Sequence, residues 1–155
     1  MLTPKFWYPE KNEKSISSTA LIPLGYIYAL LSKFRMLKSV QKHFDIPIVC
    51  IGNLNVGGTG KTPTTVSAAQ FLIEKGYDVH VVSRGYGGTV KGPLLINGKE
   101  YSANEVGDEA LMLSAFAPTW VADKRSAGIK NAISEGAEII LLDDGFQDPS
   151  FYKDL

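Results

Sequence analysis

Cysteine and histidine are almost missing from this sequence, and their scarcity limits its chemistry. The 155 residues include one cysteine, Cys50, and two histidines, His43 and His80. A single cysteine excludes an internal disulfide and a cysteine-cluster metal site, and it fits a reducing compartment. Cys50 stands in an apolar run, where we expect a core position. Each histidine is isolated in the sequence, so we expect both to pack at the end of a strand or helix.

Net charge is also lacking, because 16 basic side chains balance 16 acidic ones. Without an overall positive field, nothing draws the protein toward nucleic acid, and we expect no nucleic-acid partner. Local groups of charges must therefore be considered one by one.

The sequence has no long hydrophobic segment. Residues 1–13 lack the apolar core of a signal peptide, so we expect a cytoplasmic location. The apolar run within residues 19–37 is shorter than the roughly 20 residues that span a bilayer. We therefore expect no transmembrane helix.

Residues 19–37 nevertheless predict a helix with unusual composition. Aromatic and basic side chains alternate along and just after it: Tyr26, Tyr28, Lys33, Phe34, Arg35, Lys38 and Lys42. This composition is typical of an amphipathic helix that lies among the headgroups of an anionic membrane. An ordinary helix packed on the domain is the alternative, and the residues alone leave both open.

Glycine is concentrated in residues 49–65, VCIGNLNVGGTGKTPTT, where an apolar run enters a glycine-rich turn. The turn approximates the phosphate-binding pattern G-x-x-x-x-G-K-[S/T], with Asn55 at the first glycine position. In such a loop the backbone N–H groups face phosphate oxygens, Lys61 reaches the β- and γ-phosphates, and the Thr62 hydroxyl binds Mg²⁺. The alternative is a turn that binds nothing. We assign nucleotide binding to Asn55, Val56, Gly57, Gly58, Thr59, Gly60, Lys61 and Thr62.

Beyond this loop, apolar runs alternate with helical patterns. Strands are predicted at residues 46–51, 78–83, 119–122 and 138–142, helices at 63–75, 105–116 and 123–135, and a hairpin at 90–102 around Asn97-Gly98. The repeated βαβ order predicts an α/β fold, a P-loop NTPase-like parallel sheet flanked by helices with an N-terminal amphipathic helix. We expect two parts, residues 1–43 and residues 44–155.

Two groups of carboxylates are candidates for chemistry. The predicted strand at 138–142 delivers Asp143 and Asp144 to the carboxyl edge of the sheet, where such side chains hold Mg²⁺ directly or through water. Asp108 and Glu109 open the predicted helix at 105–116. Asp108 fits a helix cap or a catalytic base for a hydroxyl nucleophile, and spacing does not decide between them. Glu109 is a candidate metal-linked carboxylate.

Five blocks carry a family resemblance: GNLNVGGTGKTP, VVSRGYGG, VGDEALML, VADKRSAG and LLDDGFQ. Their order and approximate spacing resemble the tetraacyldisaccharide 4'-kinases of lipid A biosynthesis. The resemblance implies transfer of the ATP γ-phosphoryl group to the 4'-hydroxyl of an acylated glucosamine disaccharide 1-phosphate, with ATP and Mg²⁺ as cofactors. It also implies peripheral contact with the cytoplasmic face of the bacterial inner membrane through the N-terminal helix.

The resemblance also implies roles for single residues. The residue matching Asp108 acts in proton abstraction from the sugar hydroxyl, so Asp108 and Lys61 are the expected catalytic residues. Those matching Lys61 and Thr62 bind nucleotide and Mg²⁺, and the strand-end pair matches Asp143 and Asp144. The expected metal ligands are Thr62, Asp143, Asp144 and Glu109.

Two departures and two alternatives accompany the resemblance. Family members are considerably longer, so the chain resembles an N-terminal portion, and an inactive truncated fragment is one alternative. The position after GFQ, commonly His in the family, is Asp148. The other alternative is a P-loop ATPase of the switch or partitioning type. Partitioning ATPases carry a lysine just before the glycine pair, where this chain has Val56.

Overall fold

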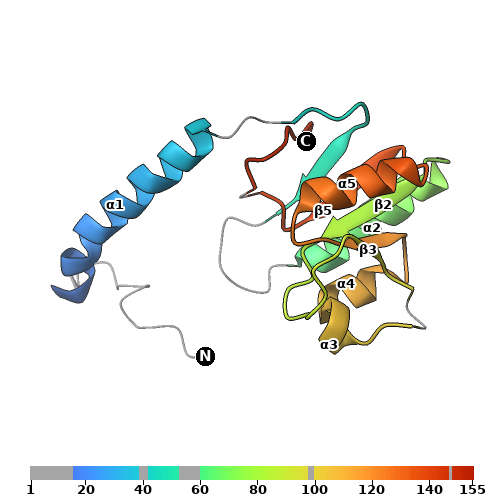
Figure 1. Ribbon diagram of the computed structural model, residues 1–155, viewed down its shortest axis with the longest axis horizontal. Helices are drawn as coiled ribbons and strands as arrows, with labels where there is room; N and C mark the ends of the chain where they lie inside the picture. Colours follow the sequence, from blue (N-terminus) through green and yellow to red (C-terminus); the bar gives the residue numbers. More distant parts are fainter. Residues whose placement is uncertain (1–15, 39–41, 53–59, 98–99, 147) are drawn as a thin grey trace. The chain divides into compact units, whose positions relative to one another are not determined.

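The computed structural model describes residues 16–38, 42–52, 60–97, 100–146 and 148–155. The chain divides into two compact units, Met1–Ser39 and Val40–Leu155 (Figure 1). The boundary expected from the sequence, between residues 43 and 44, lies close to this division.

The first unit contains one long helix, α1 (Ile16–Lys38), which includes Pro23. This helix begins and ends slightly outside the predicted range of 19–37. No helix in the described part of the chain is both long and apolar enough to cross a membrane. Large apolar side chains are exposed along α1: Ile22, Leu24, Tyr26, Ile27, Tyr28, Leu30, Leu31 and Phe34.

The second unit is built on a five-stranded sheet with the order β1-β5-β2-β4-β3. Four strands are parallel, namely β1 (Ile48–Ile51), β5 (Ile139–Asp143), β2 (Val79–Ser83) and β4 (Thr119–Val121). Every residue of β2 and β5 is buried, as expected for central parallel strands with helices on both faces. Because parallel strands end at one edge, β1, β5 and β2 deliver their carboxyl ends side by side.

Helices cover both faces of this sheet. On one face, α2 (Lys61–Glu74) and α4 (Asp108–Leu113) pack Ala69 and Leu113 against Val81 and Leu141. On the other face, α5 (Arg125–Ser134) packs Ile129 and Ala132 against Val82, Trp120, Ile140 and Leu142. Successive strand residues alternate between the two cores, since side chains of a strand point to opposite faces. The predicted α/β class with a mostly parallel sheet is confirmed.

One predicted helix is broken. Instead of a single helix at 105–116, the chain forms α3 (Ala103–Val106) and α4, separated by Gly107 with φ 90° and ψ 144°. The cause is a close contact: a β-carbon at Gly107 would lie 2.6 Å from the backbone oxygen of Tyr86. The helical pattern is therefore interrupted where the chain must pass beside the loop after β2.

The predicted hairpin at 90–102 is wrong over the residues that the structure describes. Its one strand is the short β3 (Leu94–Leu95), which pairs antiparallel with β4 rather than with a neighbouring segment. The Ile96 N–H also donates to the Thr119 carbonyl at 2.8 Å. At β3 and Ile96, the backbone hydrogen bonds that a hairpin would make within residues 90–102 are therefore made to β4 instead.

The last residues of the chain run along the outer edge of β1. The Asp154 N–H donates to the Ile48 carbonyl at 2.9 Å, and the Cys50 N–H donates to the Leu155 carbonyl at 2.7 Å. Phe151 is fully buried beside Phe44. Backbone groups on this side of β1 are therefore paired, as an edge strand requires.

The two histidines and the cysteine occupy packing positions in the described structure. His43 stacks on Tyr152 with ring centroids 4.8 Å apart. His80, near the start of β2, accepts a hydrogen bond at Nδ1 from Trp120 Nε1 at 3.1 Å. Burial lowers the pKa of His80. Cys50 is half-buried in β1, and burial raises the pKa of its thiol.

Candidate active site

The start of α2 lies where the glycine-rich turn ends. Gly60 is the residue before the helix and adopts a left-handed conformation with φ 79° and ψ 21°, which glycine tolerates without steric cost. Lys61 is the first helical residue and Thr62 lies buried in the first turn. A glycine has no side chain to cap the helix, so the positive N-terminus of α2 is suited to an anion.

Part of the predicted nucleotide site lies outside the described residues: Asn55, Val56, Gly57, Gly58 and Thr59. For these residues nucleotide binding stays a prediction. Gly60, Lys61 and Thr62 are described, and they stand at the helix start as the motif requires.

Lys61 and Asp144 meet across the carboxyl edge of the sheet. The Lys61 Nζ donates a hydrogen bond to the Asp144 Oδ1 at 3.0 Å. This hydrogen bond raises the pKa of Lys61, because the carboxylate stabilises the ammonium form. Asp144 itself has φ 52°, a left-handed conformation that is uncommon outside glycine. The start of α2 and the turn after β5 therefore lie side by side.

Asp143 lies deeper in the same site, at the end of β5, with only 2% of its surface exposed. Its Oδ2 accepts a hydrogen bond from the Ser83 Oγ at 3.2 Å, and its Oδ1 is buried with no partner among the described residues. Burial raises the pKa of Asp143, and the negative charge of Glu109 raises it further. A buried carboxylate in this state favours a neighbouring cation.

The expected metal ligands come from three elements that face this edge. Asp143 is the last residue of β5, Asp144 follows it, and Thr62 lies in α2. Glu109 in α4 is exposed, and its charge acts on both Asp143 and Lys61. No three acidic, histidine or cysteine side chains within the described ranges converge closely enough to hold a metal by themselves. Among these groups, the buried Oδ1 of Asp143, which has no partner among the described residues, is the atom that fits a cation.

Asp108 is exposed at the first position of α4. The residue before the helix is Gly107, so the cap position that the sequence offered to Asp108 belongs to its neighbour. No hydrogen bond or ion pair joins the Asp108 carboxylate to another described residue. The structure thus leaves its carboxylate available, and its role as a base stays a prediction.

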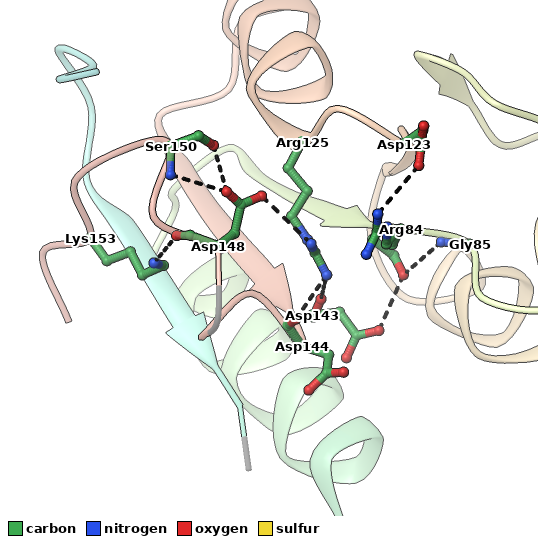
Figure 2. Close-up of polar contacts among 10 residues, drawn as sticks. Arg84, Gly85, Asp123, Arg125, Asp143, Asp144, Asp148, Ser150 and Lys153 are labelled. Carbon is green, nitrogen blue, oxygen red and sulfur yellow. Dashed lines mark hydrogen bonds and ion pairs between the residues drawn. The ribbon is translucent and has the colours of Figure 1, made fainter. Parts of the chain in front are cut away.

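Arg125 is a site residue that the sequence interpretation missed. Its guanidinium is buried at the start of α5, and Nη2 donates to the Asp144 carbonyl at 2.8 Å and to the Asp143 carbonyl at 3.4 Å. Figure 2 shows the guanidinium between these two carbonyls and the Asp148 carboxylate. Its Nη1 lies 3.7 Å from Asp148 Oδ2. The available signal was a basic residue at a helix start, where the helix dipole disfavours a cation.

Ser83 was also missed, although it ends a predicted strand beside the aspartates. Its Oγ donates to Asp143 and accepts from the Gly85 N–H at 3.4 Å. Gly85 has φ 67°, and a β-carbon there would lie 2.8 Å from the Val106 carbonyl oxygen. Ser83 therefore connects the buried aspartate to the loop that packs beside Gly107 and Asp108.

That loop also lines a small hollow of about 160 Å³. The lining residues are Arg84, Gly85, Tyr86, Gly87, Gly88, Val90, Lys91 and Asp123. Arg84 Nη2 lies 3.6 Å from Asp123 Oδ1, with both side chains more than half exposed (Figure 2). The hollow is thus next to the carboxyl end of β2.

Comparisons with known proteins place the chain among related sequences. A family model described as tetraacyldisaccharide-1-P 4'-kinase matches residues 17–155. A tetraacyldisaccharide 4'-kinase of Jannaschia sp. (strain CCS1) is 49% identical over 155 residues, which are 100% of this chain and 46% of that relative. One from Dinoroseobacter shibae is 46% identical, again over 100% of this chain and 46% of the relative. The chain thus spans about half the length of these curated relatives.

A solved structure agrees as well. The apo form of LpxK from Aquifex aeolicus, crystallised in complex with ATP, is 32% identical and superposes with a TM-score of 0.77 over 88% of this chain and 47% of that one. The fold of this chain is therefore shared with a protein that was crystallised with ATP. With the family model covering nearly all of its residues, this chain belongs to the tetraacyldisaccharide-1-P 4'-kinase family.

Proposed function

We propose that the protein containing this chain transfers the γ-phosphoryl group of ATP to the 4'-hydroxyl of a tetraacyldisaccharide 1-phosphate in lipid A biosynthesis. Family membership supports the reaction, and the observation that carries the assignment to this site is the 3.0 Å pairing of Lys61 with Asp144. The chain matches 46% of the length of its Jannaschia relative, so the activity is proposed for the full-length protein that contains it.

The ATP phosphates would lie at the N-terminus of α2. Helix N–H groups and the Lys61 ammonium both favour negative charge there, and Lys61 exchanges its Asp144 partner for phosphate oxygens. Positioning and electrostatic stabilisation supply most of the acceleration in phosphoryl transfer, so this lysine is expected to act in catalysis as well as binding. The ATP complex of the Aquifex aeolicus relative supports the choice of nucleotide.

Magnesium fits the carboxylates present at this edge. The buried Asp143 Oδ1 has no partner among described residues, and the charges of Glu109 and Asp144 act on Asp143. Thr62, in the first turn of α2, is the proposed fourth ligand. When bound with ATP, Mg²⁺ neutralises phosphate charge that develops during transfer. The Ser83 hydroxyl holds the Asp143 carboxylate in place. The Arg125 guanidinium holds Asp144 through its backbone carbonyl.

Asp108 is the proposed base. Asp108 is the first residue of α4 and directly precedes Glu109. The charge of Glu109 further raises the pKa values of Asp143 and Lys61. An exposed carboxylate that no described residue contacts is able to accept the proton of a substrate hydroxyl.

The first unit is proposed to contact the cytoplasmic face of the inner membrane peripherally. Along α1, exposed apolar and aromatic side chains accompany the exposed Lys33. An acylated substrate resides in such a membrane, and apolar burial together with basic residues would hold the helix among its headgroups. We expect no nucleic-acid partner.

The test is ATP-dependent phosphorylation of a tetraacyldisaccharide 1-phosphate by the full-length protein, with the 155-residue chain assayed beside it. We expect product from the full-length protein and none from its Lys61→Ala variant. Absence of product from a folded full-length protein that binds ATP would contradict the proposal. ATP hydrolysis without lipid phosphorylation would instead support the switch or partitioning ATPase, which the family match does not favour.

A further inference from the structure

The buried Arg125 guanidinium is poorly explained by stability. It stands at the first position of α5, where the helix dipole opposes a cation, and its Nε is buried without a partner among described residues. Its ion pair with Asp148 is long, at 3.7 Å. Because burying a charge costs free energy, an arginine in this environment is not expected to be kept for stability alone. Another role is therefore indicated.

The contacts of Arg125 converge on one short turn. Its Nη2 reaches the carbonyls of both Asp143 and Asp144, the two residues at which β5 ends. Asp144 is the one described residue other than glycine with a positive φ. A side chain that holds both carbonyls fixes this turn in its uncommon conformation, and with it the carboxylate that meets Lys61.

Close packing also holds the turn. A β-carbon at Gly145 would lie 2.9 Å from the Leu142 Cβ and 3.3 Å from the Cys50 Sγ. The Asp144 N–H donates to the Ile51 carbonyl at 3.0 Å. The turn is therefore held by contacts with β1 as well as by Arg125.

Asp148 in turn holds Arg125. Its Oδ1 accepts from both the Oγ and the N–H of Ser150, at 2.6 and 3.1 Å, which leaves Oδ2 for the guanidinium. The Lys153 Nζ donates to the Asp148 carbonyl, fixing the backbone at this residue (Figure 2). Asp148 is thus oriented by the segment after it.

We infer that Arg125, oriented by Asp148, is a positioning residue for phosphoryl transfer: it holds the Asp143–Asp144 turn so that both carboxylates face the start of α2. The inference rests on the proposed kinase function. It predicts that loss of the guanidinium slows the chemical step more than it weakens ATP binding, since small displacements of catalytic groups are costly.

The first test compares wild-type full-length kinase with Arg125→Met, which keeps the length of the side chain but no donors. The control is Lys130→Met, an exposed cation on the same helix. We expect kcat of Arg125→Met to fall by about 10- to 100-fold while KM for ATP stays within about threefold. Lys130→Met should match wild type.

The second test is amide hydrogen exchange on the full chain, which requires no activity. In Arg125→Met the Asp144 N–H should exchange at least about tenfold faster, while the Val81 and Ala122 N–H groups of the sheet stay as in wild type. A kcat within about twofold of wild type would overturn the inference. So would a uniform rise in exchange, because it indicates a general stability role.

Two further outcomes remain decisive. If Arg125→Met does not fold, Asp148→Asn replaces it. This change keeps an oxygen for Ser150 and removes the charge beside Arg125. We then expect kcat to fall about threefold to tenfold with KM for ATP unchanged, and an unchanged kcat would overturn the inference. If the wild-type protein phosphorylates no lipid, the proposed function fails, and the exchange pattern alone decides whether Arg125 holds the turn.

Discussion

Lys61 Nζ lies 3.0 Å from Asp144 Oδ1, although 83 residues separate them in the sequence. The lysine begins α2 after β1, and the aspartate follows β5, the direct neighbour of β1 in the sheet. A phosphate bound at the start of α2 would therefore lie beside the Lys61 ammonium and close to the Asp144 carboxylate, a proposed metal ligand.

Replacing Lys61 by alanine removes the cation expected to neutralise the transferred phosphate. We expect turnover of the full-length protein to fall on the order of 10³-fold, because electrostatic stabilisation dominates this chemistry. Steady-state kinetics with the lipid disaccharide measure it, with Lys130→Ala as the control for loss of an exposed lysine. Unchanged kinetics in Lys61→Ala would discard the assignment of the loop.

Asp108→Asn separates a base from a structural acid at a helix start. Asparagine keeps the shape but accepts no proton, so we expect the chemical step to slow by roughly 10²- to 10⁴-fold while ATP affinity barely changes. A helix-dipole role predicts only about 0.3 to 1 kcal/mol of lost stability. Single-turnover rates and unfolding curves measure both, with the exposed Asp45→Asn as control. Wild-type turnover in Asp108→Asn would refute the base.

The raised pKa of Asp143 predicts a stability that depends on pH. Because its pKa is higher in the folded than in the unfolded state, ionisation on raising the pH above the ordinary value of 3.8 destabilises the fold. Without nucleotide or metal, Asp143→Asn should therefore melt at a higher temperature than wild type at neutral pH. The gap should close as the pH falls toward that ordinary value.

Thermal unfolding across this pH range, with Asp45→Asn as the exposed control, tests the claim. A gap that is independent of pH would show that burial of the charge is not its cause. Mg²⁺ together with ATP should raise the melting temperature of wild type and should have a smaller effect on Asp143→Asn, since ligands stabilise the state they bind.

Gly85 and Gly87 form a matched pair in the loop after β2. Both have left-handed backbones, with φ 67° and 85°. A β-carbon at Gly85 would lie 2.5 Å from Val121 Cγ1, whereas one at Gly87 meets nothing within 4 Å. We expect Gly87→Ala to cost about 1 to 2 kcal/mol of unfolding free energy, from backbone conformation alone.

Gly85→Ala should cost about 1 to 3 kcal/mol more than Gly87→Ala, because its methyl group must displace a buried side chain and a backbone carbonyl. Urea unfolding of both variants measures the difference. Equal losses would show that the loop moves away from Val106 and Val121 without cost, so that it does not fix the approach to Gly107.

For α1, we expect the full-length protein to sediment with anionic liposomes. Charge reversal at Lys33, Arg35 and Lys38 should weaken sedimentation, since each basic residue near such a surface contributes about 1 kcal/mol. Added salt should weaken it too. Reversal at Lys130, which lies in the other unit, is the control. If neither salt nor the α1 substitutions change sedimentation, the alternative of an ordinary helix packed on the domain is favoured.

The sequence alone determined the order of the strands and helices, the glycine-rich turn that ends at Lys61, and the strand that ends in Asp143 and Asp144. These features are local, because apolar periodicity and turn chemistry act within a few residues. It also determined the family, since five short blocks in a set order carry the resemblance that the family model confirms. It did not determine the break at Gly107, because the contact that requires it comes from Tyr86.

Only the tertiary structure decided which side chains meet. Strand order placed β5 between β1 and β2, and so joined Lys61 with Asp144 and Ser83 with Asp143. The same packing brought Arg125 from the start of α5 to the carbonyls of the turn after β5. Contacts of this kind depend on register and layer packing between segments far apart in the chain, and no local pattern encodes them.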